Sequence, residues 1–280
     1  MKQFSRFEGF TQNDRFLLKT GGDSYDDFYG EIYDELMLPK ERVVFETDKI
    51  LSMIMPSKEH SVMLDAGSGT GELVHYLKDQ GYRAYGIDQS KDMIDISQTK
   101  YENIEIKHGC VTDSMSYDRS LFTHIFCMSF TIYEMDRKQK QRFFNNCSHW
   151  LQTNGYFILH LAEKDKFNTI VPAGKHPLLG TTEQLEENRI RKTVVKFPDF
   201  EYKSEYLDIF KEDERMFHKE TFVDKYTQNI RHNEKIMYME PVEEIVHMVL
   251  SSGFVAKGQF TLENGPSRDK YQTIYIFEKI

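Results

Sequence analysis

The sequence has little cysteine, a single tryptophan and no long apolar run. Its three cysteines, Cys110, Cys127 and Cys147, form no C-x-x-C pair. This argues against a disulfide framework and against a structural zinc site, and it favours a reducing, cytoplasmic location. No apolar stretch approaches the roughly 20 residues that a membrane-spanning helix needs, so we expect no membrane segment.

Positive charge is also in deficit. The 36 Lys and Arg residues stand against 45 Asp and Glu, which gives a net charge of −9. An acidic surface repels phosphate backbones, which argues against nucleic acid as a partner. Aromatic residues, by contrast, make up 14% of the 280 residues, enough to build a core and still line a pocket.

The first half of the chain alternates between short apolar runs and helical patterns. This rhythm predicts parallel strands joined by right-handed crossovers, hence an α/β fold with a doubly wound, Rossmann-like sheet. Two closing segments predict an antiparallel C-terminal hairpin on that mostly parallel sheet. The predicted strands are residues 62–64, 84–87, 104–106, 125–128 and 156–159, and the hairpin is 254–262 and 271–277.

We expect three parts. Residues 1–23 form an N-terminal arm, and residues 24–162 and 241–280 together form the Rossmann-like domain. Residues 163–240 break the rhythm and carry several alternating segments rich in Tyr, Phe, Val and charge. They predict an inserted antiparallel β lid, or substrate subdomain, whose sheet has one solvent-exposed face.

One segment carries a chemical signal. The stretch Asp65-Ala66-Gly67-Ser68-Gly69-Thr70-Gly71 follows a predicted strand and opens a helix. Its alternating glycines let the backbone turn sharply and approach a ligand, and the free helix amides add positive potential. Asp88 ends the next strand, where a carboxylate can accept hydrogen bonds from both hydroxyls of a ribose. The pair predicts a nucleoside-containing cofactor across the strand ends.

The glycine spacing distinguishes between cofactors. It is G-x-G-x-G with an acid two positions earlier, not the G-x-G-x-x-G of nicotinamide enzymes, so an oxidoreductase is the weaker alternative. Residues 62–71 resemble motif I of class I S-adenosylmethionine-dependent methyltransferases. The resemblance covers about residues 24–162 and 241–280 and implies S-adenosyl-L-methionine as the cofactor. We expect no metal.

The resemblance implies particular cofactor contacts. The glycine loop would face the aminoacyl part, Asp88 the ribose and Gln89 the adenine, while Asp65 either orients the loop or touches the ligand. Many relatives place an acid after the third strand to bind adenine. Cys110 stands there in this chain, so backbone amides near Val111, or Asp113, would take over. The full set expected at the cofactor is Tyr29, Tyr33, Asp65, Gly67, Ser68, Gly69, Gly71, Asp88, Gln89, Met93, Cys110, Val111 and Met128.

The two tyrosines of that set come from the segment 27–34. It resembles the helix that covers the cofactor in small-molecule methyltransferases, where a tyrosine often touches the methionine end. Tyr29 and Tyr33 lie four residues apart, on one helical face. Either one could make that contact, and simple packing of an amphipathic helix is the alternative.

Three residues are candidates for chemistry on the substrate. His160 lies at the carboxyl end of the fifth predicted strand, where it could act as a general base or be a hydrogen-bonded core histidine. Tyr133 and Glu134, just past the fourth strand, are candidate substrate contacts. Residues 231–234 would either line a substrate mouth or form a solvated strand edge.

We therefore expect a methyltransferase that moves a methyl group to an N or O atom of a small molecule by in-line displacement. The sulfonium is already activated, so alignment and exclusion of water suffice. The long insertion, which could close a partly aromatic chamber, favours a small acceptor. The alternatives are a protein or nucleic-acid methyltransferase, and a non-catalytic module that keeps the fold. The acceptor and the oligomeric state are not indicated.

Overall fold

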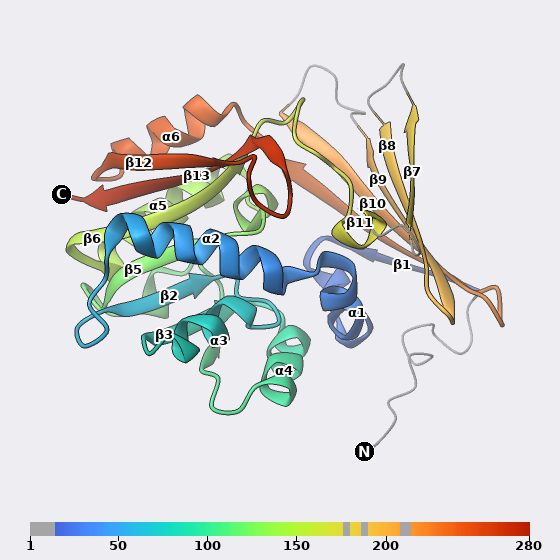
Figure 1. Cartoon of the computed structure of the whole chain (residues 1–280), viewed down its shortest axis with the longest axis horizontal. Helices are drawn as coiled ribbons and strands as arrows, with labels where there is room; N and C mark the ends of the chain where they lie inside the picture. Colours follow the sequence, from blue (N-terminus) through green and yellow to red (C-terminus); the bar gives the residue numbers. More distant parts are fainter. Residues whose placement is uncertain (1–14, 176–179, 186–189, 208–213) are drawn as a thin grey trace. The chain divides into compact units, whose positions relative to one another are not determined.

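The computed structural model describes residues 15–175, 180–185, 190–207 and 214–280 (Figure 1). The chain divides into two compact units. The first unit comprises the residues up to Leu38 together with Thr169–Met237. The second comprises Pro39–Asn168 and Tyr238–Ile280.

The second unit is built on a seven-stranded sheet with the order β12-β13-β6-β5-β2-β3-β4. Strands β2 to β6 pair in parallel, whereas β13 runs antiparallel to both β6 and β12. The predicted Rossmann-like sheet with its antiparallel C-terminal hairpin is confirmed. The strands are β2 (Val62–Ala66), β3 (Arg83–Asp88), β4 (Ile106–His108), β5 (Phe122–Cys127), β6 (Leu151–Ala162), β12 (Phe254–Leu262) and β13 (Asp269–Lys279).

Helices cover both faces of this sheet. On one face, apolar residues of α2 and α3 share a core with Met63, Phe126 and Ile158. On the other, the rings of Phe143 and Phe144 from α5 pack on Phe157, which points opposite to Ile158 because strand side chains alternate. The helices are α2 (Pro39–Ile54), α3 (Glu72–Asp79), α4 (Lys91–Lys100), α5 (Arg137–Trp150) and α6 (Val242–Ser251), with short 3-10 turns η2 (Ser114–Ser116) and η3 (Thr131–Glu134).

The first unit contains a six-stranded sheet with the order β1-β11-β10-β9-β8-β7. Strands β7 to β10 pair antiparallel, and β1 pairs in parallel with β11. One helix, α1, and two 3-10 turns, η1 (Gly21–Ser24) and η4 (Pro172–Lys175), belong to the same unit. The strands are β1 (Phe16–Thr20), β7 (Gly180–Leu185), β8 (Ile190–Lys196), β9 (Phe200–Leu207), β10 (Arg215–Asp224) and β11 (Ile230–Tyr238), and α1 is Asp27–Met37.

The position of α1 corrects the expected boundaries, which placed residues 24–38 in the Rossmann-like domain. The apolar face of α1 is buried in one core with the inserted strands, among residues that include Val195, Phe200 and Phe222. Burying that stripe outweighs the closeness of α1 to α2 in the sequence, because an exposed apolar face is costly. Helix α1 therefore belongs with the insertion.

Three smaller expectations also differ. Residues 16–20, expected within an arm, form β1, and the third strand runs over 106–108 rather than 104–106. The solvated edge considered for residues 231–234 is not found, because β1 pairs with β11 and makes it an inner strand. Arg231 and Asn233 are fully buried there. No described helix is long and apolar enough to cross a membrane.

Candidate functional site

The glycine loop connects β2 to α3. Gly67 and Gly69 have φ values of 80° and 51°, in the left-handed region that favours glycine. The N–H groups of Gly67 and Ser68 both donate to the carbonyl oxygen of Ile87, at 2.9 and 3.2 Å. These bonds fix the loop at the carboxyl ends of β2 and β3, the edge where open α/β sheets bind ligands.

Two of the loop glycines have different surroundings. A Cβ atom on Gly67 would lie 2.4 Å from Cγ2 of Thr131 in η3, so packing alone demands a glycine there. A Cβ on Gly69 would meet only Cε of Met93, at 3.5 Å, among the described residues. The loop is therefore tight on the side facing η3 and open at Gly69, where a ligand can approach the backbone.

Asp88 is tied to this loop. Its Oδ2 accepts from the N–H of Gly69 at 2.7 Å, and its Oδ1 accepts from the N–H of Ser90 at 2.8 Å. A carboxylate has about four acceptor positions, and the backbone of Gln89 also contributes a hydrogen bond, so room remains for about one further donor. Burial raises the pKa of Asp88, while backbone donors and His108 oppose that rise. The carboxylate can hold the loop and still accept a hydrogen bond from a ligand hydroxyl.

Asp65, the acid of the motif, is buried at the end of β2. Burial, together with the charge of Asp88, raises its pKa from an ordinary 3.8 to about 8. At neutral pH Asp65 therefore carries a proton. A cationic ligand nearby would favour the charged form, because an opposite charge stabilises a buried carboxylate. The carboxyl groups of Asp65 and Asp88 together fit a ligand that has a ribose and a positively charged aminoacyl end.

Two expected cofactor residues flank the loop. Met93, buried in α4, lies against Gly69 as described above. Gln89 is exposed, and its carbonyl oxygen lies 3.1 Å from Nε2 of His108. Together they border the end of β3 next to Asp88.

The segment after β4 holds the other adenine candidates. Sγ of Cys110 lies 3.0 Å from Oγ1 of Thr112, and the carbonyl oxygen of Val111 accepts from Asn146 at 2.9 Å. The carboxylate of Asp113 accepts a backbone N–H within η2. Cys110 is half-buried and Val111 is buried, while Asp113 caps η2.

The turn after β5 is strained. Ser129 and Phe130 follow Met128 with φ values of 51° and 69°, two successive non-glycine residues in the left-handed region. Such conformations cost about 1–3 kcal/mol each and gather at functional sites. The turn places the ring of Phe130 against that of His160, with centroids 4.9 Å apart and planes at 24°.

His160 is fully buried on β6. Neither ring nitrogen makes a hydrogen bond within the described part of the chain. Burial and the nearby charge of Arg42 lower its pKa to about 3, while the amide of Gln272 acts in the opposite direction. His160 is thus a neutral imidazole buried beside Arg42 and Gln272, and by distance and angle neither of its nitrogens is hydrogen-bonded to a described residue, which is rare for a buried side chain.

The other two catalytic candidates lie in η3. The hydroxyl of Tyr133 donates to the carbonyl oxygen of Ala162 at 3.0 Å and accepts from its N–H at 2.7 Å. Tyr133 is fully buried, so its hydroxyl ties η3 to the end of β6. Glu134, the last residue of η3, is half-buried.

Tyr29 and Tyr33 lie in the first unit, unlike the other predicted cofactor residues. Tyr29 is fully buried, and its hydroxyl donates to Oε1 of Glu220 at 2.8 Å. The ring of Tyr33 packs edge-on against Tyr29, with centroids 5.9 Å apart. These contacts follow from α1 packing on the inserted sheet.

Two residues near the strained turn were not predicted from the sequence. Nε of Arg42, in α2, lies 2.8 Å from Oε1 of Glu46, and Nη2 of Arg42 donates to Oγ of Ser129 at 3.4 Å. Thr131 packs on Gly67. An i,i+4 ion pair on a helix is common, so Arg42 could be singled out only through the burial of Glu46 on the apolar face of α2.

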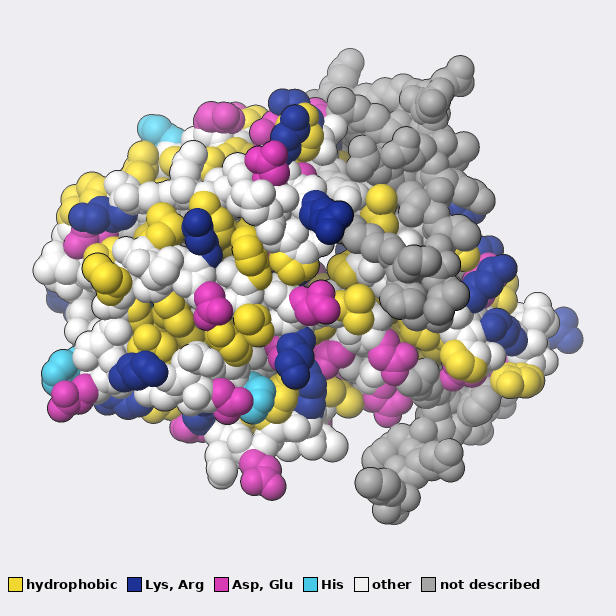
Figure 2. Space-filling model, viewed as in Figure 1, with side chains coloured by type: hydrophobic (Ala, Val, Ile, Leu, Met, Phe, Trp, Pro, Cys, Tyr) yellow, Lys and Arg dark blue, Asp and Glu magenta, His cyan; other side chains and the backbone are white. Residues whose placement is uncertain are grey.

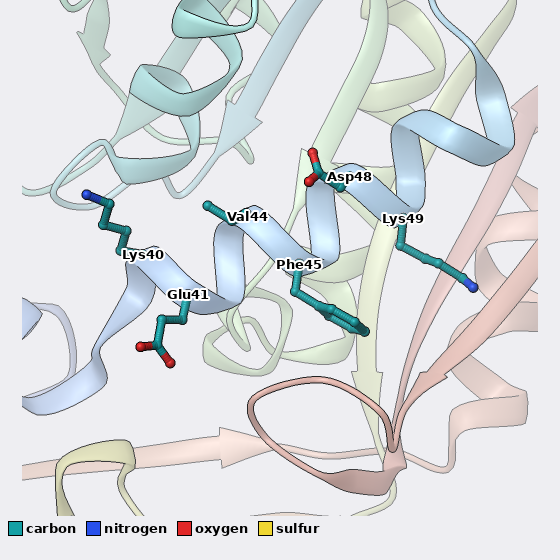
Figure 3. A pocket seen from close by; sticks show the side chains of 6 residues that line it. All are labelled: Lys40, Glu41, Val44, Phe45, Asp48 and Lys49. Carbon is teal, nitrogen blue, oxygen red and sulfur yellow. The ribbon is translucent and has the colours of Figure 1, made fainter.

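A surface hollow lies along α2. Figure 3 shows the side chains that line it, all from this one helix and none from the strand ends. The hollow is distinct in its residues from the glycine loop, and we assign it no role. The lining residues are Lys40, Glu41, Val44, Phe45, Asp48 and Lys49.

Comparison with known proteins agrees with the geometry. Residues 63–155 match the family described as a methyltransferase domain. An uncharacterized methyltransferase of Alkaliphilus oremlandii is 22% identical over 201 residues, which cover 65% of this chain and 87% of that protein.

Solved structures share the fold. An S-adenosylmethionine-dependent methyltransferase from Clostridium acetobutylicum has a TM-score of 0.63 at 15% identity, covering 90% of this chain and 97% of the other. CalS10, an amino pentose methyltransferase from Micromonospora echinaspora solved with S-adenosylmethionine bound, has a TM-score of 0.57 at 12% identity, covering 86% and 91%. Residues 63–155 are therefore a methyltransferase domain, and the chain shares the fold of solved S-adenosylmethionine-dependent methyltransferases, with its glycine loop and the acid ending β3 at the strand ends.

Proposed function

We propose that the chain transfers a methyl group to a nitrogen or oxygen atom of a small molecule. The observation that carries the proposal is His160, a buried neutral imidazole with no hydrogen-bond partner among the described residues. It lies near the carboxyl end of β6, against the strained turn after β5 and in the same unit as the glycine loop. A polar acceptor would satisfy its nitrogens.

The cofactor would lie along the strand ends of the second unit. The glycine loop and Asp65 would hold the aminoacyl part, and Asp88 the ribose. The adenine would lie among Gln89, Met93, Cys110 and Val111, with Met128 beside the sulfur. When bound, S-adenosylmethionine supplies a methyl group on a sulfonium, which needs no further activation.

The low pKa of His160 refines its expected role. A group whose pKa is about 3 holds a proton poorly, so the imidazole is a weak general base near neutral pH. Its unprotonated nitrogen can still accept a hydrogen bond and so orient an N–H or O–H of the acceptor. Because a hydroxyl needs stronger help to lose its proton than an amine does, this arrangement favours a nitrogen acceptor.

A small acceptor is supported by the charge distribution and by one relative. On the face drawn in Figure 2, basic and acidic side chains of the described residues are interspersed, without a continuous basic tract suited to a nucleic acid. CalS10, which shares the fold, is an amino pentose methyltransferase. Glu134, half-buried in η3, would be a further contact of such an acceptor.

The experiment measures cofactor binding and turnover separately. Calorimetry with S-adenosylmethionine comes first, and release of S-adenosylhomocysteine is then followed with a panel of small amines. A protein or nucleic-acid methyltransferase would turn over only with a macromolecular acceptor. A non-catalytic module would bind the cofactor and methylate nothing.

The variant His160→Phe keeps the ring that stacks on Phe130 and removes both nitrogens. We expect kcat to fall by about 100-fold, because the acceptor is no longer oriented, with the Kd for S-adenosylmethionine unchanged. His247→Phe, on the exposed side of α6, is the matched control and should leave both values unchanged. Full turnover by His160→Phe would contradict the assignment.

A further inference from the structure

A polar side chain lies beside His160 on the neighbouring strand, β13. This strand pairs antiparallel with β6, in a register that sets Ile274 opposite His160 and Gln272 opposite Ala162. Residues two apart on a strand point to the same face, so Gln272 and His160 are diagonal neighbours on one face of the seven-stranded sheet. Both are buried, and both belong to the second unit. A side chain as long as that of glutamine can reach a ring at this spacing.

Asp269 fixes the orientation of the Gln272 amide. Nε2 of Gln272 donates to Oδ2 of Asp269 at 2.9 Å. The carboxylate also accepts from the backbone N–H groups of Tyr271, at 2.9 Å, and Asn168, at 2.5 Å. In all three contacts Asp269 is the acceptor, so it selects the NH2 side of the amide. A glutamine amide has its NH2 group on one side and its carbonyl oxygen on the other, so Oε1 of Gln272 points away from Asp269.

The amide oxygen acts on the imidazole ring of His160. Burial and the charge of Arg42 lower the pKa of His160, whereas Gln272 raises it. A neighbour raises the pKa of a histidine when it accepts a hydrogen bond from a protonated ring nitrogen, which Oε1 can do and the NH2 group cannot. By distance and angle this bond is not formed in the structure. Catalytic hydrogen bonds often stay long or poorly aligned until the substrate binds, so we expect this bond to tighten in the complex.

The two nitrogens of a neutral imidazole have different roles. One carries the hydrogen, and the other has a lone pair and accepts. A hydrogen bond made by one nitrogen fixes the tautomer and thereby the role of the other. Because Oε1 of Gln272 can only accept, the nitrogen of His160 that faces it must carry the hydrogen. The stacked ring of Phe130, with its centroid 4.9 Å from that of His160, limits the rotation of the imidazole.

We propose that Gln272 and Asp269 are positioning residues for the reaction, an inference that rests on the proposed role of His160 in orienting the methyl acceptor. Asp269 holds the amide of Gln272, and the amide oxygen holds one nitrogen of His160 as N–H. The second nitrogen is then left unprotonated, and it accepts a hydrogen bond from an N–H of the acceptor. In the opposite tautomer two N–H groups would face each other, and the acceptor would be turned away from the methyl group.

A structural role accounts for Asp269 but not for Gln272. The backbone N–H of Asn168 donates to Asp269 and so ties the start of β13 to the segment that follows β6. Gln272 is not needed for that tie, and a buried amide costs free energy unless its polar groups are used. An apolar side chain would pack beside Ile274 at a lower cost, so the amide requires a reason. Its position next to His160 supplies one.

A double-mutant cycle tests whether Gln272 acts through His160. Gln272→Met keeps the length of the side chain and removes the amide. With the most rapidly methylated amine of the panel, we expect kcat to fall about tenfold and the Kd for S-adenosylmethionine to stay unchanged, because the acceptor is misaligned while the cofactor is not. Gln272→Met combined with His160→Phe should be no slower than His160→Phe alone, because no ring nitrogen remains to be oriented. Two losses that multiply would overturn the inference.

The matched control for the cycle is Gln259→Met. Gln259 is an exposed glutamine on β12, in the same sheet. Its replacement should leave kcat at the wild-type value, and a tenfold loss there would show that the loss in Gln272→Met does not depend on His160.

Nitrogen NMR of the chain with labelled histidine rings reads the tautomer of His160 without any acceptor, because protonated and bare ring nitrogens give separate signals. His160→Phe identifies the signals by their loss. With S-adenosylhomocysteine bound, we expect a single tautomer in the wild-type chain and a mixture of both in Gln272→Met. Asp269→Asn should give the same mixture, because the new NH2 group lets the amide of Gln272 turn over. A mixture in the wild-type chain, or one unchanged tautomer in both variants, would contradict the inference.

The remaining outcomes separate this inference from the proposed function. If Gln272 and Asp269 were purely structural, their variants would lower the melting temperature and leave the tautomer of His160 unchanged, which also overturns the inference. Asp269→Asn tests the same link if Gln272→Met does not fold. Full turnover by His160→Phe would instead refute the proposed role of His160, and with it the proposed function.

Discussion

The backbone N–H of Gly69 donates to Oδ2 of Asp88 at 2.7 Å. The acid that ends β3 is therefore part of the loop that follows β2, as well as the expected ribose ligand. A change at Asp88 would therefore alter the shape of the glycine loop and the expected contact with the cofactor's ribose at the same time.

Asp88→Ala should weaken binding of S-adenosylmethionine by about 1–3 kcal/mol, because the ribose loses a charged acceptor and Gly69 loses its anchor. Asp88→Asn keeps one oxygen as an acceptor and should lose less. Calorimetry measures both, with Asp95→Ala on the exposed side of α4 as the matched control. Unchanged affinity in Asp88→Ala would remove Asp88 from the cofactor site.

Gly67→Ala should destabilise the chain more than Gly69→Ala. Both positions have positive φ, which costs an alanine about 1–2 kcal/mol. Only at Gly67 does the added Cβ also meet Thr131, at 2.4 Å. Urea unfolding measures the difference, and Thr131→Ala combined with Gly67→Ala should recover part of the lost stability. Equal costs at the two glycines, with no recovery, would show that Thr131 does not crowd the loop.

Asp65→Asn should flatten the dependence of stability on pH between about 4 and 8. The unfolded chain releases the proton of Asp65 at its ordinary pKa of 3.8, whereas the folded chain keeps it up to about pH 8. The folded state therefore binds more protons in this window, and the free energy of unfolding falls as the pH rises. Asn removes that contribution. Urea unfolding at several pH values tests this, with Asp95→Asn as the control.

Much of the second unit could be predicted from local pattern. The glycine loop, the acid ending β3 and the alternation of strands and helices depend on residues close together in the sequence. The tie between Gly69 and Asp88 spans only 19 residues. A motif of this kind carries its backbone geometry within itself.

Other features depend on contacts between segments that are far apart in the sequence, and the sequence pattern does not indicate them. Helix α1 was expected in the Rossmann-like domain, but its apolar stripe packs against Phe200 and Phe222, far along the chain. The strain at Phe130 is likewise a product of tertiary packing. An aromatic residue after a strand is common, so the sequence alone does not single out Phe130.

Arg231 provides the last prediction, because it fastens α1 to the inserted sheet. Its Nη1 and Nη2 donate to the two carboxylate oxygens of Asp26 at 3.0 and 2.8 Å, and its guanidinium lies 4.7 Å from the ring centroid of Phe28. Asp26 also caps α1 by accepting from the N–H of Tyr29. This bidentate ion pair between Arg231 and Asp26 therefore fixes both the start of α1 and its position on the inserted sheet.

Arg231→Met should destabilise the first unit by about 3 kcal/mol, because it leaves the carboxylate of Asp26 half-buried without its strongest partner. Lys19→Met removes a more exposed cation 3.3 Å from the same carboxylate and should cost less than about 1 kcal/mol. Hydrogen exchange of the amides in α1 measures both effects within that unit. If Lys19→Met loosened α1 as much as Arg231→Met, the fork geometry would not be what holds the helix, and net charge at Asp26 would be the better explanation.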